Sequence, residues 1–257
     1  MVERAPIVVP RTPVARGGPD AVIVFAIGTL VAIGLVMIFS ASSYLAVAMH
    51  HDATYFFKRQ VVWFAVGLIP AYVAYRMDYH KLKNVAPLFV GAVLVLLVLV
   101  LVPHVGIFIG GARRWLGFGS MSFEPSEFAK LALVVYLAAA LATKGERVRS
   151  LVSGVVPLAF VTLLLAMLVL KEPDMGTASM LVFTSVVMLF AAGARIAHLL
   201  MMAAVTMPWV VLLVMHDTYK RARILAFLDP WKDPQDKGFH IVQSLLALGS
   251  GGAFGQG

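Results

Sequence analysis

The chain contains no cysteine among its 257 residues. This absence excludes a disulfide framework, a thiolate nucleophile and any metal site with cysteine ligands. Charged residues are also scarce, at 13% of the chain, whereas an ordinary soluble domain carries about 25%. Hydrophobic residues make up 61%. A composition this apolar excludes a typical soluble domain and predicts a membrane protein.

The few charges that are present give a formal net charge of +8. In a soluble protein this excess would suggest a nucleic-acid partner. In an apolar chain it is more typical of loop lysines and arginines near anionic lipid. We therefore predict a membrane as partner and no nucleic acid. The histidines are scattered without the spacing of metal ligands, so we predict no metal site from them.

Seven apolar segments are candidates for membrane-spanning helices, each of which needs roughly 20 mainly apolar residues. They are residues 21–48, 61–75, 85–102, 122–142, 151–170, 175–193 and 196–215. Each is predicted to be helical because backbone polar groups in lipid must be hydrogen-bonded within their own segment. The sequence therefore predicts an all-α polytopic membrane protein with seven transmembrane helices.

Three regions follow from these spans. Residues 1–20 are rich in proline and arginine, which predicts a disordered cytoplasmic tail. Residues 21–215 form the seven-helix transmembrane region. Residues 216–257 form an extracytoplasmic loop, in which "YKRARILAFL" and "HIVQSLLAL" have the patterns of interfacial or re-entrant helices.

The orientation follows from the loop charges. When the long last loop, residues 216–257, is set aside, lysines and arginines are more numerous in the loops on the N-terminal side, by ten against six, which places the N-terminus inside and residues 103–121 outside. The basic residues left on the outer side lie in "GARRW", "PSEFAK" and "KEPD", beside tryptophan, proline and acids. Basic residues on the disfavoured side indicate a function there, such as holding an anion.

The stretch "FLDPWKDPQDKGF", residues 227–239, crowds Asp229, Asp233 and Asp236 and two Asp-Pro steps into the outer loop. Because proline restricts the preceding residue to extended conformations, such a loop could hold a carboxylate in one place. A solvated turn explains the same residues equally well. A third interpretation is an oxygen-ligand site for Mg²⁺ or Ca²⁺, although the spacing matches no EF-hand.

The stretch "GGARRWLGFGSMSFEPSEFAK", residues 110–130, carries a second group of charges. Arg113 and Arg114 stand beside Trp115 in a Gly-rich loop. Glu127 and Lys130 are three residues apart at the start of a predicted helix, so they share a face. Helix capping and snorkelling to the interface would explain these residues without any function. Charges in membrane segments more often face a cavity, which favours a functional site.

A third charged stretch, "LKEPDMGTA" at residues 170–178, separates two apolar helices with almost no linker. The residues alone favour a tight hairpin whose charges Lys171, Glu172 and Asp174 lie at the membrane interface.

With these residues identified, the chain resembles the SEDS family of bacterial cell-wall polymerases, which comprises FtsW, RodA and SpoVE. The resemblance is carried by "FSASS" (39–43), "GARRWLGFGSMSFEPSEFAKLALVVYLA" (111–138), "EPDMGTA" (172–178) and "RILAFLDPWKDPQDKGFHIVQSLLALGSGGAFGQG" (223–257). These motifs are closer to FtsW or SpoVE than to RodA. The family continues beyond the Gly-rich stretch where this chain stops, so the resemblance implies a C-terminally truncated member.

The resemblance implies a multi-pass protein of the bacterial inner membrane that polymerises lipid II during cell division or septal wall synthesis. It also implies a class B penicillin-binding protein and other division proteins as partners. The family's essential aspartate corresponds to Asp233, the second Asp-Pro of the motif. A lipid II flippase and a non-enzymatic division scaffold are the alternative functions.

The chemistry of lipid II polymerisation assigns a role to each candidate residue. Asp233 is the candidate general base for the attacking sugar hydroxyl. Cationic side chains would hold the leaving pyrophosphate, with Mg²⁺ or another divalent cation as a candidate helper. The substrate-binding candidates are Arg113, Arg114, Trp115, Glu127, Lys130 and Trp231. Within this set Glu127 would orient Lys130, while the two tryptophans would stack on sugar faces or anchor at the interface.

Overall fold

A computed structural model describes residues 18–257 except 110–111, 119–120, 217, 253–254 and 256–257. The predicted disordered tail, apart from its last three residues, therefore lies outside the described residues. The chain divides into two compact units, one ending at Arg76 and the other beginning at Met77.

The first unit is a pair of helices, α1 (Ala21–His50) and α2 (Tyr55–Arg76), that pack against each other. Asp20 begins α1, because its carboxylate accepts hydrogen bonds from two backbone N–H groups of the first turn. The connection to α2 is closed by an ion pair of 2.9 Å between Lys58 Nζ and Asp52 Oδ2.

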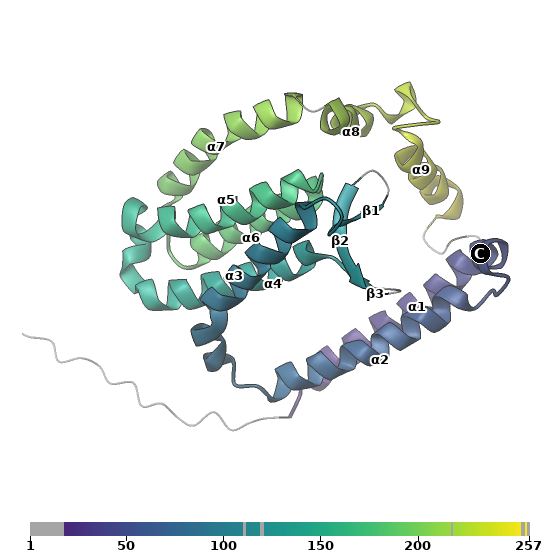
Figure 1. Ribbon diagram of the computed structural model, residues 1–257, viewed down its shortest axis with the longest axis horizontal. Helices are drawn as coiled ribbons and strands as arrows, with labels where there is room; N and C mark the ends of the chain where they lie inside the picture. Colours follow the sequence, from purple (N-terminus) through teal and green to yellow (C-terminus); the bar gives the residue numbers. More distant parts are fainter. Residues whose placement is uncertain (1–17, 110–111, 119–120, 217, 253–254, 256–257) are drawn as a thin grey trace, which may run out of the picture. The chain divides into compact units, whose positions relative to one another are not determined.

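The second unit is built around four helices, α3 (Leu82–Leu101), α4 (Pro125–Lys144), α5 (Val156–Lys171) and α6 (Met175–Ala191). Helix α3 packs on α4, α5 packs on α6, and α4 contacts α6 (Figure 1). Leucines from all four helices are fully buried between them: Leu97, Leu133, Leu137, Leu158, Leu165, Leu181 and Leu189. A hydrogen bond of 2.9 Å from the Thr162 hydroxyl to Ser185 Oγ joins α5 to α6 inside this core.

The remaining helices of this unit follow α6 in the chain. They are α7 (Ile196–His216), α8 (Thr218–Leu228) and α9 (Phe239–Gly251). Short helical turns complete the unit: η1 (Tyr79–Lys81), η2 (Gly145–Arg149), η3 (Leu151–Val155) and η4 (Pro230–Lys232). Helices α8 and α9 coincide with the two segments predicted to be interfacial helices, and their placement at an interface stays a prediction.

The seven predicted spans correspond to helices α1 to α7, although residues 122–123 of the fourth predicted span lie in a short strand, Met121–Phe123, that precedes α4. Among the described residues, four helical stretches are long and apolar enough to cross a membrane: Ala21–His50, Tyr79–Leu101, Pro125–Arg149 and Leu151–Lys171. Helix α6 has 17 residues, which is short for a span. A mainly helical, multi-span fold is therefore confirmed, and the count of seven crossings stays a prediction.

A small antiparallel sheet in the loop between α3 and α4 was not predicted from the sequence. Its strands are β1 (Ile107–Ile109), β2 (Ala112–Phe118) and β3 (Met121–Phe123), in the order β1-β2-β3. Strand β2 contacts both α3 and α4, and its Ala112 and Leu116 are buried. The loop is therefore a fixed platform on the helices, and it carries the Arg-Arg-Trp motif.

Candidate active site

Strand β2 fixes Arg114 against the turn between α5 and α6. The Nε–H group of Arg114 donates to the carbonyl oxygen of Glu172 at 2.8 Å. A terminal guanidinium nitrogen donates to the carbonyl oxygen of Pro173 at 2.5 Å. The planar fork of arginine suits two adjacent acceptors, and a lysine could not reproduce this geometry. Arg114 thus ties the sheet to the helical core.

Arg113 and Trp115 are the neighbours of Arg114 along β2. Successive side chains of a strand point to opposite faces, so these two residues lie on the other face of the sheet from Arg114. Their partners in β1 are Phe108 and Ile107, respectively. The two arginines therefore point to opposite faces of the sheet, and Arg114 faces the helical turn.

The turn between α5 and α6 is the predicted tight hairpin, and its charged side chains differ in their exposure. The Asp174 carboxylate accepts a hydrogen bond of 3.0 Å from the Thr177 N–H and begins α6. The Glu172 side chain, in contrast, is fully buried. Neither of its carboxyl oxygens has a hydrogen-bond partner among the described residues.

This burial sets the protonation of Glu172. Loss of solvent raises its pKa to about 8, and the negative charges of Glu124 and Asp174 act in the same direction. The nearby Arg114 opposes them only in part. At neutral pH the Glu172 side chain is therefore mostly a neutral acid.

Helix α4 brings a further acid to the same region. Glu124 is the residue before the helix, and Pro125 is its first residue, a position that proline favours. Burial raises the pKa of Glu124 above its ordinary value of 4.5. Its electrostatic neighbours include Asp174 and Arg114, so the start of α4, the start of α6 and strand β2 meet at one polar cluster.

One turn further along α4, Lys130 and Glu127 form the predicted contact. Lys130 Nζ lies 2.8 Å from Glu127 Oε1. The Lys130 side chain is 39% exposed and that of Glu127 is 59% exposed. The shared face and the orienting contact are thus confirmed, and both side chains remain accessible to a ligand.

The Asp-Pro motif forms a tight turn between α8 and α9. Asp229 and Asp233 have φ values of −140° and −144° but ψ values of only 80° and 69°, so their backbone is not helical and yet falls short of the extended ψ of about 120° to 160° expected before proline. The Gly238 N–H closes the turn by donating to the Asp233 carbonyl oxygen at 2.9 Å. Gly238 is required here, because a Cβ atom would lie 2.1 Å from the carbonyl oxygen of Pro230.

The carboxylates of this turn differ in their exposure. Asp233 is half-buried, whereas Asp229 and Asp236 are exposed. Trp231 lies in η4 and is 59% exposed. Turn η4 packs against α8 and α9. The predicted approach of Asp233 to Lys130 and Arg114 stays a prediction.

Glu172 is the residue of the candidate site that sequence reasoning missed. Its signal was present, because a glutamate between two apolar helices with no linker has little room to reach solvent. The described residues contain no group of three histidine, aspartate or glutamate side chains that could hold a metal ion.

The long apolar helices and the polar cluster beside them define a multi-pass helical membrane protein. A family model described as cell cycle protein, covering FtsW, RodA and SpoVE, matches residues 20–257. The chain belongs to this family, as its motifs predicted.

Individual relatives agree with this assignment. The chain is 42% identical over 247 residues to the probable peptidoglycan glycosyltransferase FtsW of Trichlorobacter lovleyi, covering 96% of this chain and 65% of that protein. It is 38% identical to the stage V sporulation protein E of Bacillus subtilis, covering 94% of this chain and 66% of that protein. The chain thus spans just under two thirds of the length of these relatives.

Two solved structures share the fold. A chain of a peptidoglycan synthase complex, described for its coordination of polymerization and crosslinking, matches with a TM-score of 0.71 and 34% identity over 91% of this chain and 66% of that chain. The rod shape determining protein RodA of Thermus thermophilus matches with a TM-score of 0.62 and 34% identity over 76% of this chain and 59% of its own.

Proposed function

We propose that the full-length protein is a peptidoglycan glycosyltransferase that polymerises lipid II during cell division or septal wall synthesis. The observation that carries the proposal is the 42% identity, over 96% of the chain, to a protein named as a probable peptidoglycan glycosyltransferase. The polar cluster of β2, α4 and the α5–α6 turn supplies side chains suited to this chemistry.

The reaction joins two lipid II molecules. The 4-hydroxyl oxygen of one GlcNAc attacks the anomeric carbon of the other molecule's MurNAc. The new glycosidic bond forms as the bond to the lipid pyrophosphate breaks, and the pyrophosphate leaves with the bonding electrons. Asp233 accepts the hydroxyl proton, which makes the oxygen a better nucleophile. The half-buried position and fixed backbone of Asp233 support this role.

The leaving pyrophosphate needs positive charge that is already in place. Lys130 is a flexible cation steered by Glu127, and Arg114 is held by two backbone carbonyl groups. A preorganised cation stabilises developing negative charge without a cost of reorientation. We assign Lys130 and Arg114 to the pyrophosphate. Arg113, Trp115 and Trp231 are assigned to the sugars and the headgroup periphery.

We further propose that the protein lies in the bacterial inner membrane with its N-terminus in the cytoplasm. The site then faces outward, where residues 103–121 and 216–257 would meet the lipid II headgroup. A class B penicillin-binding protein and other division proteins are the proposed partners. The similarity to a chain of a peptidoglycan synthase complex supports such an assembly.

This topology can be tested by cysteine labelling, because the chain has no cysteine of its own. A membrane-impermeant thiol reagent should modify Ser122→Cys in intact spheroplasts and should spare Ser150→Cys until the membrane is opened. Both serines are exposed in the folded chain, so burial does not explain a difference. The reverse pattern would contradict the orientation and the outward site together.

The ion pair of α4 gives a second prediction. Lys130→Ala should lower the polymerisation rate of the full-length protein by about 10-fold or more, since a charge-assisted contact to the pyrophosphate is lost. Glu127→Gln should have a smaller effect, because it removes the orienting charge but keeps the cation. Rates are measured with purified protein and labelled lipid II. Equal effects of the two changes would show that the pair acts only as a helix contact.

The proposed activity itself is tested with the purified full-length protein and its class B penicillin-binding protein. Labelled lipid II should be converted to glycan strands that are resolved by gel electrophoresis. A transpeptidase-inactive partner serves as the matched control, since glycan polymerisation does not need crosslinking. No strands in the presence of a folded complex would contradict the proposal.

A further inference from the structure

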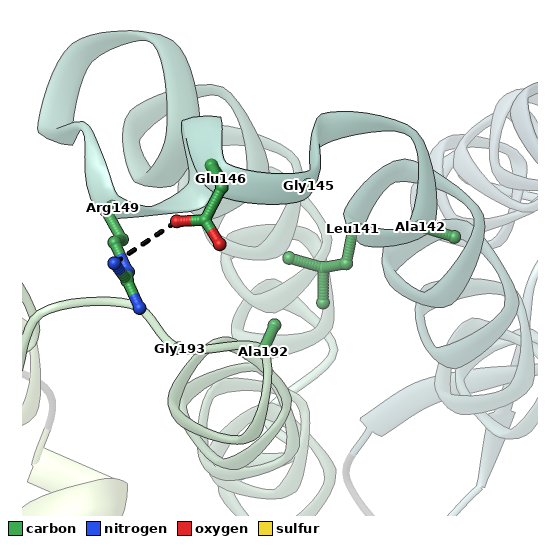
Figure 2. A pocket seen from close by; sticks show the side chains of 7 residues that line it. All are labelled: Leu141, Ala142, Gly145, Glu146, Arg149, Ala192 and Gly193. Atoms are coloured by element: carbon green, nitrogen blue, oxygen red, sulfur yellow. Dashed lines mark ion pairs between the residues drawn. The ribbon is translucent and has the colours of Figure 1, made fainter. Parts of the chain in front are cut away.

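A cavity lies at the other end of α4, away from the candidate active site. It has a volume of about 520 Å³ and lies between the end of α4, turn η2 and the residues after α6. Figure 2 shows Glu146 and Arg149 on one side of it and Ala192 and Gly193 on the other. A volume of this size is in the range of small-ligand sites in proteins.

Small residues keep this cavity open. Ala142, Gly145, Ala192 and Gly193 line it. Gly145 and Gly193 have φ values of +50° and +87°, a backbone region that glycine adopts without strain. A Cβ atom at either position would meet nothing within 4 Å. The cavity therefore exists because the backbone turns at Gly145 and at Gly193 carry no side chain that would fill it.

Arg149, a cation that lines the cavity, forms only a weak ion pair. Arg149 lies 3.2 Å from Glu146 Oε2, and their side chains are 63% and 85% exposed. An ion pair this exposed contributes little stability. The guanidinium can therefore turn from Glu146 to a better acceptor, and a phosphate group accepts two parallel hydrogen bonds from arginine.

The charge around the cavity favours an anion. Lys144, Arg147 and Arg149 lie at the end of α4 and in η2, and Arg195 follows Gly193 on the facing turn. Against these four basic residues, Glu146 is the one acidic residue within 144–149 and 192–195. The Lys144 ammonium donates to the carbonyl oxygen of Ser153, whereas Arg147 and Arg195 are exposed.

The position along the helix selects a lipid as the source of the anion. The cavity lies at the end of the apolar stretch Pro125–Arg149, which is the depth of lipid headgroups if this helix spans the membrane. Leu141 continues the cavity wall toward the apolar part of α4. Basic pockets between helices at this depth are suited to acidic lipid headgroups.

We propose that this cavity binds the phosphate-bearing headgroup of an anionic phospholipid, with Arg149 as its principal contact. The proposal is independent of the glycosyltransferase chemistry at the opposite end of α4. A lipid bound in this cavity would hold the C-terminal ends of α4 and α6 at the lipid surface. The site therefore predicts selectivity for anionic over zwitterionic phospholipid.

The test uses the full-length protein in detergent, titrated with phosphatidylglycerol or phosphatidylcholine that carries a fluorescent acyl chain. Arg149→Gln removes the contact, and Ala192→Leu fills the cavity without changing any charge. Both should weaken phosphatidylglycerol binding by about tenfold, the size expected for one lost charge-assisted pair. Arg76→Gln, a basic residue outside the cavity, is the matched control and should bind as the wild type does. Size-exclusion elution and thermal unfolding establish that each variant is folded.

Several results would overturn the proposal. Equal losses in Arg149→Gln and Arg76→Gln would indicate diffuse attraction to the whole basic surface. Wild-type binding by folded Ala192→Leu would show that the cavity is not used. Displacement of the lipid by equimolar inorganic phosphate would identify a soluble phosphate as the ligand. Unchanged lipid binding in both cavity variants, with loss of a co-purifying division protein, would identify a protein partner.

Discussion

Asp233→Asn in the full-length protein is expected to lower the rate of lipid II polymerisation by about 10²–10⁴-fold, the usual contribution of a general base. Asparagine keeps the shape of the side chain and loses the ability to accept a proton. The backbone of the turn is fixed by the following proline and by the Gly238 N–H, so the substitution should leave the fold intact. Lipid II binding, measured separately by co-purification of labelled substrate, should persist.

Asp229→Asn is the matched control for this experiment. It lies before a proline in the same motif with a similar φ, but its side chain is exposed where Asp233 is half-buried. Its effect on the rate should therefore be small. Equal, small effects of the two substitutions would contradict the general-base role and favour a scaffold or a transporter. Loss of binding together with activity in Asp233→Asn, with wild-type binding that responds to Mg²⁺, would indicate a metal ligand instead.

Glu172→Gln is expected to stabilise the protein at alkaline pH. The pKa of Glu172 is raised by burial to about 8 from its ordinary value of 4.5. The folded protein therefore holds a proton that the unfolded chain releases between these two values, so the free energy of unfolding falls as the pH rises from about 4.5 to about 8. The stabilisation that comes from the protonated Glu172 is fully present below pH 4.5, the ordinary pKa of a glutamate. Glutamine stays neutral, so the variant should lack this loss.

The expected difference at pH 8 is roughly 2–5 kcal/mol in the free energy of unfolding, from 1.36 kcal/mol for each unit of pKa shift. At pH 5 the variant and the wild type should be close. The free energy of unfolding of the variant and of the wild type is measured by denaturant unfolding in detergent at both pH values. Glu146→Gln changes an exposed glutamate, with 85% of its side chain accessible, and should leave the pH dependence as in the wild type. A wild-type stability that is flat from pH 5 to pH 8 would show that Glu172 is not buried as a neutral acid.

The helices could be predicted from the sequence because each depends on a local property. Long apolar runs located all seven helical segments, α1 to α7. The spacing of Glu127 and Lys130 predicted their contact, since a helix places residues three apart on one face. Proline likewise predicted that Asp229 and Asp233 avoid the helical conformation, and their φ values of −140° and −144° agree. In each case the cause lies within a few residues of the effect.

The features that escaped prediction depend on distant parts of the chain. Strands β1 and β3 have three residues each, too few for a periodic pattern, and they exist because β2 pairs with both. Arg114 binds carbonyl groups 58 and 59 positions away. The burial of Glu172 likewise requires the packing of other elements around the α5–α6 turn. No local pattern in the sequence encodes the strand pairing or the contacts of Arg114, and for Glu172 the local signal is limited to its place between two apolar helices with almost no linker.

Glycosyl transfer, rather than transport of lipid II, is the activity that we propose for the polar cluster of β2, α4 and the α5–α6 turn. It is tested most directly by reconstituting the full-length protein with its class B penicillin-binding protein in vesicles that carry labelled lipid II. Polymerised glycan and lipid II moved between leaflets are then measured in the same sample. The account predicts glycan strands that depend on Asp233 and no translocation above that of empty vesicles. Translocation of unpolymerised lipid II, with no glycan formed, would contradict it.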